Sequence, residues 1–225
     1  MDDTIVSLSE QAFFTIVTAA LEAYKVDHSK LEDGSEVRLE TFGNLWGHST
    51  KHNRSVVYHV SYADVSTSAS REKVEVTPND QAYNLKKEFV DYFFPEMSHL
   101  GDYHSHPYSV EDGIKSELKL ERDGFHKFSP GDFKAVRAEH KKKRDYRVGI
   151  VVTVFERDDE NFIARKVQWI DKTSCVRFQY NKMTIWIKAY VWAGDEKRKR
   201  ADKKVSIVCP TIGLPLLKIR QNDIV

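Results

Sequence analysis

The segment Gly101-Asp-Tyr-His-Ser-His-Pro107 holds the residues best suited to chemistry, two histidines separated by one residue. Successive side chains of a β-strand point to opposite faces, so His104 and His106 would share a face and direct two imidazoles at one point. A short strand can supply two nitrogen ligands to a metal ion in this way. An isolated His-x-His is more commonly a pair of surface or hydrogen-bonded histidines, so a metal site needs further ligands.

A second candidate segment is Ser129-Pro-Gly-Asp132. A serine N-cap, a proline at the first helical position and an acidic residue three positions after the cap form an ordinary helix start, which is the commoner meaning of this pattern. The functional interpretation makes Asp132 a carboxylate metal ligand on the first helical turn. Ser129 would then be a hydrogen-bond donor beside the metal.

A third candidate is Glu40, which comes just before Phe42-Gly-Asn-Leu-Trp-Gly47. A glutamate at the start of a strand is normally a solvated charge. Beside a metal-activated water, however, a carboxylate can act as general base and then pass the proton to a leaving amine. Glu36 lies four residues earlier and could do the same, and the residues alone do not choose between the two.

Together, the three segments resemble the motif of the JAMM family of zinc-dependent proteases, also called MPN+ or JAB. That motif is an upstream Glu, then His-x-His, a spacer and Ser-x-x-Asp, matched here by Glu40, His104, His106, Ser129 and Asp132. The resemblance implies that the two histidines and Asp132 bind Zn²⁺ and leave a fourth position for water. It also implies that Glu40 is the general base and that Ser129 helps to stabilise the oxyanion.

The spacer between His106 and Ser129 departs from the family, in which it is usually much shorter. A nearer Ser-x-x-Asp exists at Ser109–Asp112, but it follows His106 too closely and precedes Gly113 rather than a helical pattern, so Ser129 and Asp132 are preferred. The additional residues, 108–127, are predicted to form a polar loop or short helix beside the metal. A lid over the site and a tolerated surface insertion both fit this segment.

The resemblance further implies a substrate class. It predicts an isopeptidase or peptidase that cleaves after the C-terminal tail of a ubiquitin-like protein, in deconjugation or in precursor processing. The modest length is similar to that of stand-alone prokaryotic members, which are associated with ubiquitin-like conjugation, sulfur-carrier processing and antiviral defence operons. Partners within a conjugation system are therefore also expected.

Two other functions are kept open. The first is a non-catalytic MPN-type scaffold subunit that binds protein partners, although such members typically lack the metal ligands found here. The second is a metal-dependent hydrolase of small molecules or phosphoesters, which would be expected to recruit further His and Asp ligands. His48, His52 and His59 do not have the spacing of such a second metal site, and solvated or hydrogen-bonded histidines are the simpler interpretation.

The elements that must position these residues are predicted from periodicity. Ser7-Leu-Ser-Glu10 has the spacing of a capping box and predicts a helix near residues 8–25. Asn79 is expected to cap a second helix whose buried stripe includes Tyr83, Val90, Phe93 and Phe94, and a third helix is expected to run from Ser129 to about Lys142. Strands are expected at 37–39, 42–46, 56–65, 100–106, 147–156 and 162–171, the fifth and sixth joined by a turn at 157–161.

These elements predict an α/β fold, a mixed β-sheet flanked by helices. The family resemblance implies a JAMM/MPN, cytidine-deaminase-like core. Residues 1–172 are assigned to this domain and residues 173–225 to a β-rich C-terminal extension packed on it. Within the extension, a helix at 180–193 remains an alternative to strands, a charged stretch occupies 195–204, and a β-like segment covers 205–219.

Composition limits the function classes. The chain has 225 residues, 40% of them hydrophobic and 31% charged, with a net charge of +1, so no nucleic-acid partner is expected. The basic runs at 141–144 and 197–200 suit a solvated helix end and loop or an acidic protein partner. The apolar runs are too short to span a bilayer and the N-terminus is acidic, so no membrane association or secretion is expected. Two isolated cysteines, Cys175 and Cys209, favour a reducing cytoplasm.

Overall fold

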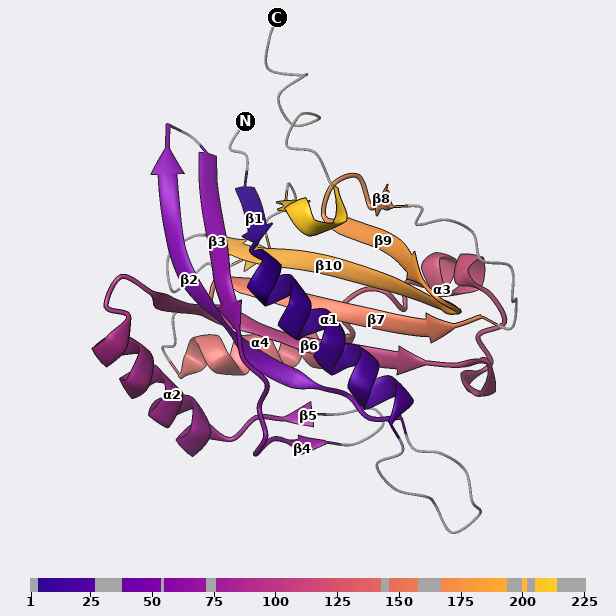
Figure 1. Ribbon diagram of the computed structural model, residues 1–225, viewed down its shortest axis with the longest axis horizontal. Coiled ribbons are helices and arrows are strands. Elements are labelled where there is room, and N and C mark those ends of the chain that lie inside the picture. Colours follow the sequence, from indigo (N-terminus) through magenta and orange to yellow (C-terminus); the bar gives the residue numbers. More distant parts are fainter. Residues whose placement is uncertain are drawn as a thin grey trace, which may run out of the picture.

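The computed structural model describes residues 4–26, 38–53, 55–71, 76–142, 146–157, 167–193, 200–201 and 205–213. Over these residues the protein is a mixed α/β structure with one curled mixed sheet and four α-helices (Figure 1). The helices are α1 (Glu10–Lys25), α2 (Asp80–Phe93), α3 (Glu117–Asp123) and α4 (Pro130–Lys141). The strands are β1 (Thr4–Leu8), β2 (Phe42–His52), β3 (Ser55–Ala63), β4 (Ser70–Arg71), β5 (Val76–Thr77), β6 (Ser98–Tyr108), β7 (Val148–Glu156), β8 (Gln168–Ile170), β9 (Cys175–Tyr180), β10 (Met183–Ala193), β11 (Arg200–Ala201) and β12 (Val205–Val208).

The main sheet has the strand order β12-β1-β3-β2-β6-β7-β10-β9-β8, with β11 paired to β10. The pairs β12–β1, β1–β3 and β6–β7 are parallel, and the other neighbours along this order are antiparallel. The predicted mixed sheet flanked by helices is therefore present. The short strands β4 and β5 form a separate hairpin.

Alternation along β7 divides the core between the two faces of the sheet. Val148, Ile150, Val152 and Val154 belong to the large cluster that packs against α1, which crosses one face of the sheet (Figure 1). Val151 belongs instead to a cluster with residues of α4 and its approach. Because both faces are covered, β7 is mostly apolar, with Thr153 and Glu156 its polar residues, rather than alternating between apolar and polar residues.

The predicted α1 helix is present, but its predicted capping box is wrong. The N-cap is Ser9, whose hydroxyl accepts a hydrogen bond from the backbone N–H of Ala12. Ser7 lies in β1, where it is paired with His59 of β3 and Val208 of β12. Local spacing could not show this, since the pairing of β1 between two distant strands is what keeps Ser7 extended.

Strand β6 extends beyond its predicted end at Pro107 and reaches Tyr108. The ladder between β2 and β6 begins at the pair Phe42–His104, whereas the pairing with β7 continues through Pro107 to Tyr108. Proline lacks an N–H, but it is tolerated where one side of a strand has no ladder to complete.

Helix α2 begins as predicted, because the Asn79 side chain accepts hydrogen bonds from the backbone N–H groups of Gln81 and Ala82. Its predicted buried stripe is wrong for Phe93 and Phe94, which are exposed, while Tyr83 and Val90 are half-buried; no residue of the helix is fully buried. The large apolar side chains of α2 and its C-terminal end are instead exposed, namely Leu85, Phe89, Tyr92, Phe93 and Phe94. Amphipathic spacing predicts a helical face but does not show what covers it.

The chain after residue 172 contributes strands to the same sheet. β10 pairs along its length with β7 and is a strand, so the helix considered at 180–193 is not formed. β12 pairs with β1 at the other end of the sheet order. The division into a domain and an extension at residue 172 stays a prediction. The predicted features at 158–166, 195–199, 202–204 and 214–219 lie outside the described residues. None of the helices in the described part of the chain is long and apolar enough to cross a membrane.

Close backbone approach between β6 and β7 makes Gly101 a test of this architecture. A Cβ at Gly101, whose φ is +150°, would lie 1.8 Å from the Val148 carbonyl oxygen. We expect Gly101→Ala to lower the free energy of unfolding by about 3 kcal/mol or more, measured by chemical denaturation. Gly124→Ala is the matched control, because Gly124 also has a positive φ but a Cβ there would meet only the Lys127 side chain, at an ordinary contact distance of 3.8 Å. It should cost only about 1–2 kcal/mol, and equal losses in the two variants would contradict the predicted clash.

Candidate metal centre

Strand β6 presents His104 and His106 on one face of the sheet, as the alternation predicts. Both side chains are buried, and their Nε2 atoms lie 3.2 Å apart. The intervening Ser105 donates its backbone N–H to the Thr41 carbonyl and accepts a hydrogen bond from the Thr41 N–H on its hydroxyl. The two imidazoles are therefore held by a strand that is bonded on both sides, to β7 and to the segment that enters β2.

Asp132 reaches the same point from the first turn of α4. Its Oδ2 lies 3.4 Å from the Nε2 atoms of both His104 and His106. The helix start has the predicted form, with a proline at the first position and a reciprocal capping box between Ser129 and Asp132. The Ser129 N–H donates to Asp132 Oδ2 at 2.6 Å, and the Asp132 N–H donates to Ser129 Oγ at 3.1 Å. Capping therefore fixes the carboxylate that faces the histidines.

His104, His106 and Asp132 form the one group in the described part of the chain that could hold a metal ion. Each offers one ligand atom, and all three atoms lie within 4.8 Å of one another. Two imidazole nitrogens and a carboxylate oxygen converging in a largely buried location can hold one divalent cation. The structure thus brings together three of the five residues named from the sequence as neighbours on a common centre.

The electrostatics of the cluster show how tightly it is coupled. Burial opposes ionisation of Asp132, but hydrogen bonds and positive charge from His104 and His106 hold the pKa of its carboxyl well below the ordinary range. Burial lowers the pKa of His104. Burial also opposes protonation of His106, yet the hydrogen bond and charge of Asp132, together with the charge of Glu40, raise the pKa of His106 above its ordinary value of 6.5. In the metal-free protein, His106 therefore keeps a second proton to higher pH than His104 does.

Glu40 lies beside this cluster at the entrance to β2. It is only 8% exposed, and its negative charge acts on His106 and on Tyr108. Burial, followed by the charges of Glu40 and Asp132, raises the pKa of Tyr108 to about 12. A partly desolvated carboxylate next to a candidate metal site suits proton transfer. Glu36, the alternative considered from the sequence, lies outside the described residues.

The long spacer folds into a compact element rather than an open loop. Ser109 and Asp112 form the capping box of a single 3₁₀ turn, and neither belongs to the metal-ligand group found in the described residues. Ile114 and Leu120, on α3 and its approach, are buried in a cluster with Trp186 of β10. The predicted short helix is therefore present as α3 and packs on the sheet, and the choice between a lid and a tolerated surface insertion stays a prediction.

Sequence reasoning missed a contact at the far side of His106. The backbone carbonyl of Phe125 lies 3.4 Å from His106 Nδ1. The carbonyl can only accept, so Nδ1 carries the hydrogen and the neutral ring keeps its Nε2 lone pair for the metal side. No sequence signal could have found this partner, because every residue has the same backbone carbonyl whatever its side chain is.

The other histidines and the basic runs do not form a second metal centre in the described residues. The rings of His48 and His59 stack with their centroids 4.7 Å apart, and His59 Nε2 lies 3.0 Å from Thr50 Oγ1. Lys142 forms ion pairs with Asp80 and Glu139, as expected of a solvated helix end. Most of the run at 197–200 lies outside the described residues.

Removing one imidazole tests the metal centre directly. We expect His104→Ala to lower the affinity for a divalent metal by more than about 100-fold, because loss of a direct ligand should exceed the roughly 10–100-fold cost of losing an outer partner. Competition with a chromophoric chelator measures this affinity. His48→Ala is the control, since it removes an exposed histidine outside the cluster. Unchanged metal binding in His104→Ala would contradict the assignment.

The raised pKa of His106 predicts the pH dependence of metal binding. Its ring binds a proton at pH values above 6.5, and this proton must leave before Nε2 can coordinate. The apparent affinity should therefore fall as the pH decreases through the pKa of His106, approaching about tenfold per pH unit for one proton. Asp132 does not contribute to this pH dependence of the affinity, because its carboxyl stays ionised over the same pH range. Chelator competition across about pH 6–8 measures the effect, and a flat profile would show that no proton is displaced.

Comparison with known proteins identifies no relative. No family model matches this sequence, and no curated protein matches it. The function is therefore argued below from the residues of the site and their geometry.

Proposed function

We propose that this protein is a zinc-dependent isopeptidase or peptidase that cleaves after the C-terminal tail of a ubiquitin-like protein. The observation that carries the proposal is the convergence of His104, His106 and Asp132, whose ligand atoms lie 3.2–3.4 Å apart, with Glu40 beside them. Three ligands from the protein with a carboxylate nearby is the arrangement of a hydrolytic metal site.

We assign zinc to this donor set, which suits it. Zinc accepts imidazole nitrogen and carboxylate oxygen at about 2.0–2.2 Å, and tetrahedral ligands at that distance lie roughly 3.3–3.5 Å from one another. The spacings of 3.2, 3.4 and 3.4 Å between the three ligand atoms are close to this value. Three protein ligands leave a fourth tetrahedral position for water or substrate, as catalytic zinc sites do and structural sites do not.

When bound, a zinc ion would supply Lewis acidity and lower the pKa of a water ligand from about 15.7 towards about 7. The chain itself must then move the protons. Glu40 would accept a proton from the attacking water as the new C–O bond forms. It would return that proton to the amine nitrogen as the C–N bond breaks, so that a carboxylic acid and a free amine leave.

Ser129 is suited to assist the carbonyl oxygen during this reaction. Its Oγ accepts a hydrogen bond from the Asp132 N–H, which leaves the hydroxyl proton free to be donated. A donor directed at a developing oxyanion contributes roughly 3–4 kcal/mol in other hydrolases. The capping role and the proposed catalytic role are compatible because they use different parts of one hydroxyl group.

The substrate class comes from the resemblance to the JAMM family. The sequence matches the order Glu, His-x-His and Ser-x-x-Asp, and His104, His106 and Asp132 of this motif converge on one centre, which supports carrying over the family's substrates. The tail of a ubiquitin-like protein is extended and could add as a strand beside the site. A cytoplasmic location and a place in a bacterial ubiquitin-like antiviral conjugation system are part of the same proposal.

A second candidate function is that of a scaffold subunit that binds protein partners. It is favoured by the apolar groove between α2 and the β2–β3 hairpin, lined by exposed Leu85, Phe89 and Tyr92 and by Tyr62. Exposed apolar patches of this kind often mark protein–protein contacts. A scaffold function does not account for the buried metal-ligand group, so catalysis remains the preferred proposal.

Replacement of the proposed base separates catalysis from metal binding. We expect Glu40→Gln to retain zinc while losing about 10²–10⁴-fold in turnover, since only proton transfer is removed. A panel of ubiquitin-like fusions, assayed with and without a chelator, measures turnover, and elemental analysis measures zinc. Glu111→Gln is the control, because Glu111 is an exposed carboxylate that pairs with Arg38.

Three outcomes would contradict parts of this proposal. If Glu36→Gln inactivates the enzyme and Glu40→Gln does not, then Glu36 is the base. Chelator-insensitive cleavage would exclude a role for the metal. Stoichiometric zinc without cleavage of any fusion, with active controls, would instead favour the scaffold function.

A further inference from the structure

The last part of the spacer, residues 125–128, is attached to the sheet on the same face as the metal centre. The Phe125 carbonyl lies 3.4 Å from both His106 Nδ1 on β6 and Thr153 Oγ1 on β7. The Phe128 N–H donates to the hydroxyl of Tyr190 on β10 at 3.1 Å. These contacts join the segment to three adjacent strands, so its position is set by the sheet rather than by the loop alone.

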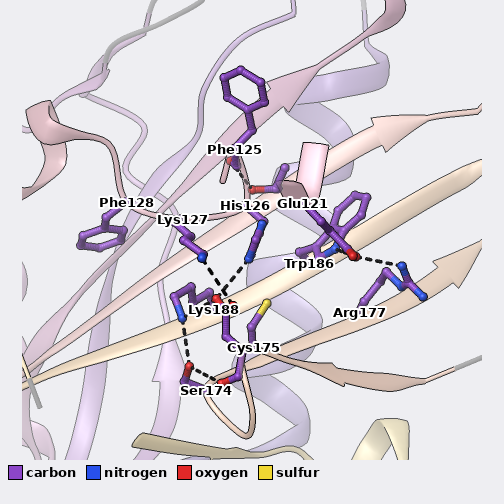
Figure 2. Close-up of polar contacts among 12 residues, drawn as sticks. Glu121, Phe125, His126, Lys127, Phe128, Ser174, Cys175, Arg177, Trp186 and Lys188 are labelled. Carbon is purple, nitrogen blue, oxygen red and sulfur yellow. Dashed lines mark hydrogen bonds and ion pairs between the residues drawn. The ribbon is translucent and has the colours of Figure 1, made fainter. Parts of the chain in front are cut away.

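The strongest attachment of this segment runs through Asp171. His126 Nε2 lies 3.1 Å from Asp171 Oδ2, and Lys127 Nζ lies 3.4 Å from Asp171 Oδ1. Lys188, which extends from β10, lies 3.1 Å from Asp171 Oδ2 and donates to Ser174 Oγ at 2.9 Å. Figure 2 shows the contacts of His126 and Lys127 meeting beside Lys188, and the Lys188 amine directed at Ser174. One carboxylate thus pairs with Nε2 of a histidine that is 1% exposed and with Nζ of a lysine that is 7% exposed. His126 Nδ1, in contrast, is buried without a hydrogen-bond partner among the described residues.

Asp171 is in turn held by the fold. Asp171 and Lys172 have φ values of 52° and 66°, a left-handed conformation that residues other than glycine rarely adopt. The next residue, Thr173, accepts a hydrogen bond from the Ile207 N–H and donates its hydroxyl to the Val205 carbonyl, both on β12. The turn that carries the carboxylate is therefore anchored to the distant end of the chain.

The sheet register places this cluster close to the metal ligands. His104 is paired with Val151, and Val151 is paired on its other side with Lys188, so the three residues form one row across β6, β7 and β10. His106, Thr153 and Trp186 form the adjacent row. Rows of paired residues point to one face, so the Asp171 cluster and the histidines share that face at a separation of two strands.

We propose that Asp171 is a positioning residue for His106, acting through His126 and the Phe125 carbonyl. The carboxylate holds His126, and His126 holds the adjacent carbonyl against His106 Nδ1. The hydrogen is thereby kept on Nδ1, and the Nε2 lone pair is left for a metal ion held jointly with Asp132 and His104. This inference rests on the metal centre of the proposed function, and it makes the segment 108–127 a support for a ligand rather than a lid.

Outer partners of this kind tune both the tautomer and the basicity of a metal-binding histidine. We expect Asp171→Ala to lower Zn²⁺ affinity by about 10–100-fold in chelator competition. In the metal-free protein, at a pH above the His106 pKa, ¹⁵N NMR of the His106 ring should show the Nδ1–H tautomer in wild type and a shift towards Nε2–H in the variant.

Asp123→Ala is the matched control. Asp123 lies in the same spacer, its side chain is 30% exposed against 28% for Asp171, and it also pairs with two cations, Lys119 and Arg122. Within the part of the chain that the structure describes, the hydrogen bonds of Asp123 go to Lys119 and Arg122 and not to the Phe125 segment, so both the Zn²⁺ affinity and the His106 tautomer should stay as in wild type.

His126→Phe provides a second route to the same answer if Asp171→Ala does not fold. Phenylalanine fills the buried space of His126 but cannot bond Asp171, so it should reproduce the losses of affinity and of the Nδ1–H tautomer. Wild-type tautomer and affinity in either folded variant would overturn the inference and leave Asp171 a purely structural residue. If wild-type protein binds no Zn²⁺, the proposed function fails, whereas the tautomer comparison in metal-free protein still decides the positioning role.

Discussion

The alternation of side chains along β6 is the constraint on which the rest of the structure depends. Tyr103 points into the core beneath α1, and His104 and His106 point to the opposite face. A slip of one residue in the pairing of β6 with β7 would exchange these two sets, placing imidazoles in the apolar core and an aromatic ring at the site. The register is held by ladders on both sides, and close backbone approach at Gly101 leaves no room for a side chain there.

The second constraint is the double use of Asp132. One oxygen of its carboxylate accepts the Ser129 N–H and also faces both histidine rings. A free carboxylate on a long side chain would have to lose rotamer freedom to bind a metal, whereas this one is already ordered by the helix cap. The helix N-terminus also favours a negative charge, which adds to the stabilisation that the histidines provide. Local helix chemistry and site chemistry thus require the same residue at the same position.

The face of the sheet that carries the site is built from segments far apart in the chain. The entrance to β2 contributes Glu40, β6 the histidines, α4 the aspartate, and the turn after β8 the carboxylate that anchors the spacer. The spacer itself is fastened by buried Ile114 and Leu120 and by the ion pair of Glu121 with Arg177 on β9. Packing of this kind couples the strands after residue 172 to the geometry around His106. Helix α2 lacks such packing. Asn79 caps it as predicted, yet its large apolar side chains are exposed.

The sequence by itself determined which residues could bind a metal and the local elements that carry them, because His-x-His alternation and the Ser-Pro-x-Asp helix start are properties of a few consecutive residues. It also predicted the mixed α/β class, since periodicity reports burial on one or both faces. Tertiary structure alone decided that Ser7 is paired rather than capping, that α2 is uncovered and that 183–193 is a strand between β7 and β9. Tertiary structure alone also brought the Phe125 carbonyl into contact with His106 and Asp171 into contact with His126. These contacts join residues 19 and 45 positions apart, and a backbone carbonyl has no side-chain signature, so only the pairing of strands could bring them together.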